Sequence, residues 1–252
     1  LQADVPIAGQ LSIAGQMEGT LSDPRFAGAL GLFDASYGGT RIPQLNATFD
    51  YADESLETRV VASRQGGLAL AAAEGTLPLN LAFTDVTGSR ILERPMEAEL
   101  VADRLPLDVL PQVTDQVQNV QGRVIGSIVA RGTPRDPALA GALALDLGSF
   151  GIAATGATVR DIVGYLRLAG DTIVVDSLVG WAGGPIRVAG GLGIGNYAEP
   201  SFDLELTTQN ALVLNNDQGR VRADADLTMR GPFDSVRVEG SARIRGDMVY
   251  VE

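Results

Sequence analysis

The sequence predicts an all-β protein whose strands form an elongated, curved and repetitive β-sheet, shaped as an open trough or β-taco. Two observations support this fold class: apolar and polar residues alternate with a period of two, and a strand–turn–strand unit recurs along the chain. Glycine is also frequent, at 31 of 252 residues. A helical protein rarely contains so much glycine, because each one costs roughly 1 kcal/mol relative to alanine inside a helix.

The alternation is clearest between Val221 and Arg230, where every odd position is apolar and every even position is polar. Residues 202–207 and 236–240 also alternate, there with the apolar residues at the even positions. Successive side chains of a strand point to opposite faces of its sheet, so each stretch predicts a strand with one apolar face. A helix would scatter the same apolar residues around its cylinder.

The recurring unit starts at Gly19, Gly132 and Gly231, and in each copy a second glycine follows nine residues later. Asp and Pro between the two glycines are typical turn residues, so each copy predicts a hairpin. Residues 42–77 and 157–192 form a second shared block of strands, with acidic turns and a glycine pair.

Together these blocks predict one continuous repetitive unit over residues 1–252, with repeats near residues 9–100, 120–200 and 219–252. The chain begins and ends in mid-pattern, so we interpret it as a fragment of a longer protein.

One segment departs from the alternation. Leu107, Leu110, Val113, Val117 and Val120 recur at spacings of three and four, which predicts a short amphipathic helical segment near residues 106–120. Such a segment would cap one end of the apolar face or, alternatively, act as a functional gate.

The residue types present argue against most site chemistry. The chain has no His and no Cys, which removes the usual general base, the common nucleophile arrangements and the thiolate and imidazole metal ligands. We therefore expect no enzyme, no catalytic residue, no cofactor and no metal site. A formal charge of −12 also argues against nucleic acid as a partner, because phosphate binding needs clustered cations.

Carboxylate-only chemistry stays open on two residue pairs. Asp203 with Glu205, and Asp224 with Asp226, each lie two positions apart on a predicted strand and so share its face. That face is the polar one, opposite the apolar stripe, so we interpret both pairs as solvated surface residues.

The ordered series of motifs resembles the TamB family, within the AsmA-like group of bacterial envelope proteins. The resemblance rests on residues 132–141, 170–176 and 183–190, together with Leu105-Pro106-Leu107 and the last hairpin repeat, residues 231–240. It implies a periplasmic protein of the Gram-negative cell envelope, anchored to the inner membrane through an N-terminal segment that this chain lacks. It also implies a translocation and assembly module, with roles in outer-membrane biogenesis, protein secretion and phospholipid transport.

The resemblance implies two partners: phospholipid acyl chains and an outer-membrane barrel of the TamA kind. A trough with one apolar face would carry acyl chains between the inner and outer membranes, support outer-membrane protein assembly, or do both. The residues that we predict to contact lipid are Phe202, Leu204, Leu206, Val221, Ala223, Ala225, Leu227 and Met229.

Three alternatives remain open on the sequence. The first is a β-helical adhesin or passenger, or another structural binding module, although coils of such proteins usually repeat every 20–30 residues or so. The second is a β-helical enzyme that uses two carboxylates, and the third is a purely structural spacer.

Overall fold

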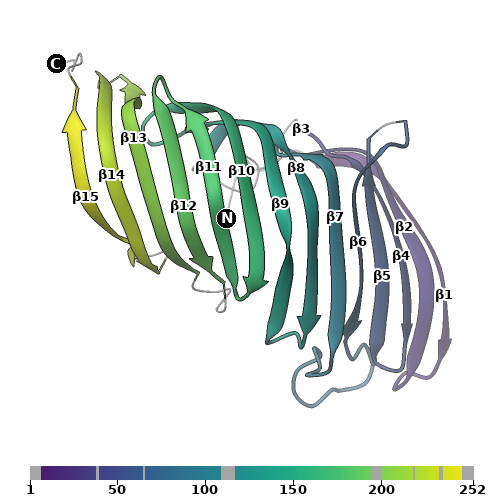
Figure 1. The fold of residues 1–252 in the computed structure, drawn as a ribbon. Coiled ribbons are helices and arrows are strands. Elements are labelled where there is room, and N and C mark those ends of the chain that lie inside the picture. The colour runs from purple at the N-terminus through teal and green to yellow at the C-terminus, as the bar shows by residue number, and fades with distance from the viewer. Residues whose placement is uncertain are drawn as a thin grey trace. The chain divides into compact units, whose positions relative to one another are not determined.

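The chain folds as an all-β protein in the computed structural model, which describes residues 7–37, 40–64, 66–108, 117–194, 200–217, 219–232 and 235–245 (Figure 1). These residues form fifteen strands and no α-helix. The strands are hydrogen-bonded in chain order from β1 to β15, except that β3 pairs beside this path with β2. The predicted fold class, a repetitive all-β sheet, is therefore confirmed, and the trough shape stays a prediction.

The pairing also bears on the alternatives. Every strand pair for which a register is given is antiparallel. A β-helix instead stacks its strands in parallel from coil to coil. The described residues therefore do not form the β-helix that the adhesin alternative and the two-carboxylate enzyme alternative require.

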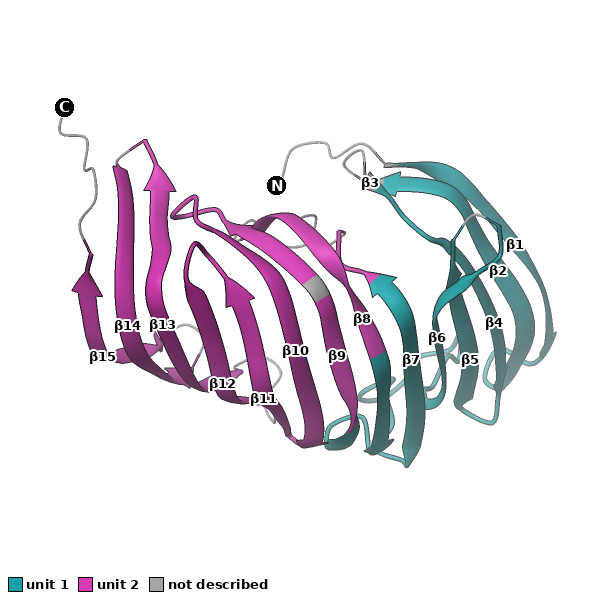
Figure 2. Cartoon of the chain, turned by 45° about the horizontal axis from the view of Figure 1, so that its top comes forward, with its two compact units in different colours: residues 1–105, 126–140 teal, residues 106–125, 141–252 magenta. Residues whose placement is uncertain are grey.

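Two compact units divide the chain: residues 1–105 with 126–140, and residues 106–125 with 141–252 (Figure 2). Strands β8 (Val117–Gly132) and β9 (Pro137–Ile152) contribute residues to both units. The prediction of one continuous unit with repeats near residues 9–100, 120–200 and 219–252 stays a prediction.

Unit 1 holds seven further strands, the last of which extends one residue beyond it: β1 (Ile7–Gly19), β2 (Pro24–Tyr37), β3 (Thr40–Arg41), β4 (Gln44–Ala52), β5 (Ser55–Ser63), β6 (Ala69–Pro78) and β7 (Met96–Pro106). Its tightest turn joins β4 to β5 through Asp53 and Glu54, with φ angles of 52° and 58°. Two successive residues at positive φ suit the right-handed twist of a two-residue hairpin.

Unit 2 holds the remaining six strands: β10 (Thr158–Gly170), β11 (Thr172–Trp181), β12 (Pro185–Gly193), β13 (Ser201–Asn216), β14 (Gly219–Pro232) and β15 (Arg237–Ile244). Strands β10, β11 and β12 correspond to β4, β5 and β6 of the other unit, as the shared sequence block predicts. Gly170, at φ 66°, lies in the turn that corresponds to Asp53 and Glu54.

The three predicted hairpins are confirmed as β1–β2, β8–β9 and β14–β15. The first glycine of each has a positive φ, and a Cβ on Gly19 or Gly132 would lie 2.3 Å or 2.5 Å from a carbonyl oxygen of its own turn. In two of the turns a Thr amide donates to an Asp carbonyl: Thr20 to Asp23, and Thr133 to Asp136. Glycine recurs at this position because another side chain would meet backbone there.

The helical prediction near residues 106–120 is wrong at both of its ends. Pro106 ends β7, and Val117 and Val120 lie in β8. Branching at Cβ makes valine stiff and favours strands, which outweighs the helical spacing. Residues 109–116, the centre of this prediction, lie outside the described part of the chain.

β-Bulges interrupt three strands at an Asp or Asn residue. The register gains one residue in β2, β10 and β13, and there Asp34, Asp161 and Asn210 have φ angles of 49°, 55° and 50°. Asp and Asn tolerate this left-handed region better than most residues. Each bulge shifts the alternation by one position, so that apolar residues three apart in sequence can share a face.

Gly190 and Gly191 provide a matched test of how closely neighbouring strands approach. Gly190 has φ 129°, and a Cβ there would lie 2.2 Å from the carbonyl oxygen of Asp203, whereas a Cβ on Gly191 would meet nothing closer than 3.6 Å. We expect Gly190→Ala to lower the free energy of unfolding by about 1–3 kcal/mol, and Gly191→Ala to change it by less than about 0.5 kcal/mol. Urea unfolding of the two variants measures both values, and equal midpoints would contradict the close approach.

Candidate functional site

Unit 2 presents one apolar sheet face from β10 to β15. Leu206 in β13 lies directly opposite Val188 on one side and Leu227 on the other. The next row places Leu204 between Gly190 and Met229. Directly opposite residues of antiparallel strands share a face, so these rows run across the sheet on one side.

All eight residues predicted to contact lipid lie on this face. Register pairs join Leu204 to Met229 and Leu206 to Leu227. The bulge at Asn210 brings Ala211 opposite Ala223 and keeps the face continuous. Ala223 is buried, and the other seven, namely Phe202, Leu204, Leu206, Val221, Ala225, Leu227 and Met229, are half-buried. Their contact with lipid stays a prediction.

Sequence reasoning missed most of the same face outside β13 and β14. The register adds residues from four further strands, namely Leu166, Leu168, Ile173, Val175, Leu178, Ile186, Val188, Leu192, Val238 and Ile244. The alternation of β12 could have revealed Ile186 and Val188. In β11 the bulge between Val175 and Leu178 hides the pattern, because these two residues are three apart and still share the face.

Unit 1 has an apolar face of its own, built by the same register rule. Its rows contain Leu32, Leu45 and Ala62; Leu30, Ala47 and Val60; and Phe26, Tyr51 and Leu56. The ring centroids of Phe26 and Tyr51 lie 4.6 Å apart in a stacked arrangement, and Phe26 meets Phe49 edge-on. In the row that contains Gly15, Gly28 and Gly75, the ring of Phe49 lies beside Gly28, where a Cβ would come within 2.6 Å of it.

Neither face is buried as a core normally is. Few large side chains in the described residues are almost fully buried, among them Ile162 at 1% exposure and Tyr51 at 2%. At the outer strands the apolar residues are open to solvent: Met17 is 64% exposed and Ile244 is 72% exposed. Large uncovered apolar surfaces mark binding sites in soluble proteins.

A loop covers one small part of the face in unit 2. The connection between β9 and β10 reaches β13, where the amide of Asn215 donates to the carbonyl oxygen of Thr155 at 2.8 Å. A Cβ on Gly156 would lie 2.2 Å from the carbonyl oxygen of Asn215. The buried cluster of this unit lies nearby and consists of Val159, Ile162, Ala182 and Ala211, with Leu145, Phe150, Leu178 and Ile186 packed against it.

The polar face of unit 2 carries the two carboxylate pairs, as predicted. Asp203 accepts a hydrogen bond from Arg230 Nε at 2.9 Å, and Glu205 and Asp226 are exposed. Asp224 accepts from the amide of Asn210 at 2.8 Å and from Arg245 Nε at 2.5 Å. Through these hydrogen bonds, the carboxylate of Asp203 links β13 to β14, and the carboxylate of Asp224 holds the β13 bulge and Arg245 beside β14.

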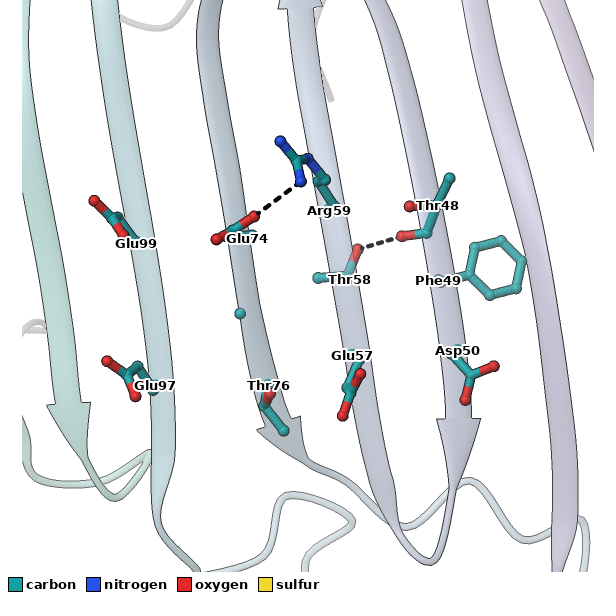
Figure 3. A pocket seen from close by; sticks show the side chains of 11 residues that line it. Thr48, Phe49, Asp50, Glu57, Thr58, Arg59, Glu74, Thr76, Glu97 and Glu99 are labelled. Carbon is teal, nitrogen blue, oxygen red and sulfur yellow. Dashed lines mark hydrogen bonds and ion pairs between the residues drawn. The ribbon is translucent and has the colours of Figure 1, made fainter.

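In unit 1 the polar face has an open hollow of about 490 Å³, and five of its eleven lining residues are acidic (Figure 3). Asp50 lies directly opposite Glu57, and Glu74 lies opposite Glu99. Arg59 partly offsets this repulsion, with its guanidinium 3.4 Å from Glu74. No group of three or more acidic side chains in the described residues is arranged to hold a metal ion.

The comparisons with known proteins identify one family. Residues 176–252 match the family model described as the TamB C-terminal domain. This match supports membership of the TamB family and confirms the family that the sequence resemblance predicted. No curated protein and no solved structure matches the chain.

The TamB match also indicates the general class of the protein and the part of the cell in which it acts. The family implies a cell-envelope protein of translocation and assembly or of lipid transport, is generally non-enzymatic, and functions with outer-membrane partners. Within the described residues, no helix has the length and hydrophobicity that a bilayer crossing requires.

Asp224 should respond to loss of Arg245 in a pH titration. The hydrogen bond from Arg245, followed by that from the Asn210 amide, lowers the pKa of the Asp224 carboxyl below its ordinary value. A lowered pKa adds stability above the ordinary pKa, and that stability is lost as the pH falls through the folded pKa. We expect Arg245→Gln to raise the pKa of Asp224, as measured by carboxyl NMR.

Asp176 is the internal control for this titration. Its pKa is also lowered, by a hydrogen bond from Arg167 in the neighbouring strand, and Arg245 takes no part in that contact. The Arg245→Gln variant should leave the pKa of Asp176 unchanged. An unchanged pKa of Asp224 in this variant would contradict the assignment of its lowered pKa to Arg245.

Proposed function

We propose that this chain, whose residues 176–252 match the TamB C-terminal domain, is part of a periplasmic envelope protein whose apolar sheet faces carry phospholipid between the inner and outer membranes. Acyl chains would lie on the apolar faces, and the protein would be anchored in the inner membrane.

The observation that carries this proposal is the uncovered apolar face of each unit. An ordinary sandwich would bury such a face under a second sheet. Here the rows around Leu206 in unit 2 and around Ala47 in unit 1 stay half-buried. A face of this kind is suited to a flexible apolar ligand.

The energetics favour an acyl chain as that ligand. Moving one methylene from water to an apolar surface gains about 0.8 kcal/mol, so ten methylenes would gain roughly 8 kcal/mol if they were fully buried. Half-burial on an open face gives less, which suits a carrier, because a transported lipid must also leave. The opposite face of each unit, with its Arg and carboxylate side chains, keeps the protein in solution.

A second role, support of outer-membrane protein assembly, rests on strand β15. All eight of its residues are exposed, and within the described residues it pairs with β14 alone. An edge strand presents unpaired backbone amides and carbonyls to any strand that can add to it. An outer-membrane barrel of the TamA kind would supply such a strand.

The lipid proposal is tested by matched substitutions at two neighbouring residues of β14. Leu227 lies on the apolar face, whereas Thr228 points to the polar face beside Glu205 and Glu239. We expect Leu227→Gln to reduce bound phospholipid by about fivefold or more. The substitution removes apolar surface from the face, and the loss of that contact weakens the binding free energy by about 1 kcal/mol or more. Thr228→Gln should leave the bound phospholipid unchanged.

Native mass spectrometry of the chain purified from a bacterial envelope, with lipid extraction alongside, measures this difference. Circular dichroism of both variants checks that each keeps its strands. A wild-type chain without lipid, or equal occupancy in the two variants, would contradict the proposal and leave a role in protein assembly.

A further inference from the structure

The connection between β6 and β7 in unit 1, residues 79–95, forms a strap across the ends of the neighbouring strands. The amide of Leu79 donates to the carbonyl oxygen of Glu54 at 2.9 Å, and the amide of Leu81 donates to the Tyr51 hydroxyl at 2.8 Å. The amide of Phe83 then donates to the carbonyl oxygen of Leu21 at 2.8 Å. The strap therefore passes from the β4–β5 turn to the β1–β2 turn.

The strap lies over the apolar face of unit 1. Tyr51 belongs to that face, because it pairs with Phe26 and Leu56 in register, and it is only 2% exposed. The Tyr51 hydroxyl reaches the strap backbone at Leu81, and the neighbouring Ala82 is buried as well. This end of the face is therefore closed, whereas Met17 and Ile13 on the same face of β1 are exposed.

Polar side-chain contacts add to these backbone hydrogen bonds in holding the strap in this closed position. Glu54 accepts a hydrogen bond from Asn80 Nδ2 at 2.8 Å and forms an ion pair with Arg94, while Glu93 pairs with Arg135 at 2.9 Å. Exposed ion pairs stabilise by only about 0–1 kcal/mol each. A segment held in this way opens far more readily than the strands below it.

Two of the larger apolar side chains of the strap are exposed, whereas Leu79, Leu81 and Leu92 are half-buried. Phe83 is 61% exposed and Ile91 is 47% exposed, and Leu21, beside Phe83 in the β1–β2 turn, is 66% exposed. In the closed position these side chains gain little from burial. If the strap lifted, they would be free to contact an apolar ligand that entered beneath it.

We propose that residues 79–95 are a gate over the apolar face of unit 1, closed by Glu54 through Asn80 and Arg94 and opened for an acyl chain to enter or leave. This inference rests on the proposed function. In this gate Glu54 is the latch, and the strap ends beside β6 and β7 are the hinge. Phe83 and Ile91 make the first apolar contacts with the entering acyl chain.

A cross-link tests the gate directly. The chain has no Cys, so a Leu21→Cys/Phe83→Cys variant carries two exposed thiols as its only ones, and a short bismaleimide joins the strap to the β1–β2 turn. The same variant capped with N-ethylmaleimide is the matched control. The measurement is the rate at which a fluorescent phospholipid exchanges between the chain and vesicles of phosphatidylethanolamine and phosphatidylglycerol.

We expect cross-linking to slow phospholipid exchange at least about tenfold relative to the capped control, because a locked lid prevents entry and release. Arg94→Gln, which removes one latch contact, should speed exchange by roughly two- to fivefold. Equal exchange rates in the cross-linked and capped chains would overturn the gate, even though both chains bound lipid.

Hydrogen exchange separates failure of the gate from failure of the lipid proposal, because it needs no ligand. We expect the amides of Leu79, Leu81 and Phe83 to exchange together, faster than those of β5, and faster again in Arg94→Gln. If these amides are protected as strongly as those of β5, the strap does not open and the gate is overturned. If they open as expected and no phospholipid binds, the lipid proposal fails instead.

Discussion

The structure depends on one constraint: in each unit, the rows of apolar side chains that pack together must lie on one face of a sheet that has no second layer above it in the described residues. The hydrophobic effect drives folding here through half-buried rows of side chains and leaves little closed core. In such a sheet a one-residue slip would move a whole strand's apolar residues into water. Register is therefore the property that the remaining features of the molecule must protect.

The β-bulges keep the apolar residues on one face at points where the alternation in the sequence shifts by one position. At Asn210 the extra residue leaves backbone groups without ladder partners, and side chains of β14 satisfy them. Arg222 donates to the carbonyl oxygen of Asn210, and Asp224 accepts from its amide. An unpaired backbone group is costly, so these polar side chains fix the register as firmly as the apolar rows do. Polar side chains on one face thus keep the apolar residues in register on the other.

Sequence patterns predicted the parts of this fold that depend on local chemistry. Glycine at positions 19, 132 and 231 marked the hairpins, because backbone lies where a side chain would be. The strict alternation of β14 placed Val221, Ala223, Ala225, Leu227 and Met229 on one face, because β14 contains no bulge.

The parts that depend on distant contacts were not predictable in the same way. The bulge between Val175 and Leu178 breaks the alternation, and only pairing with β12 shows that both residues share a face. Residues 79–95 have no periodic pattern, since their position is set by contacts with Tyr51 of β4 and with Glu54 and Leu21 of two turns. Near residue 117 a spacing of three and four suggested a helix, yet pairing into the sheet decided the conformation of Val117 and Val120.

The chain-order pairing has a consequence for how such a protein is made. Each strand from β4 onward finds its first partner in the strand that precedes it along this order, so contacts form mainly between segments close in sequence. Low contact order permits fast folding, and a chain that emerges from one end can add each new strand to a finished edge. Duplication of a hairpin lengthens such a sheet without disturbing the strands already in place. Reach across a compartment can therefore evolve by repetition alone.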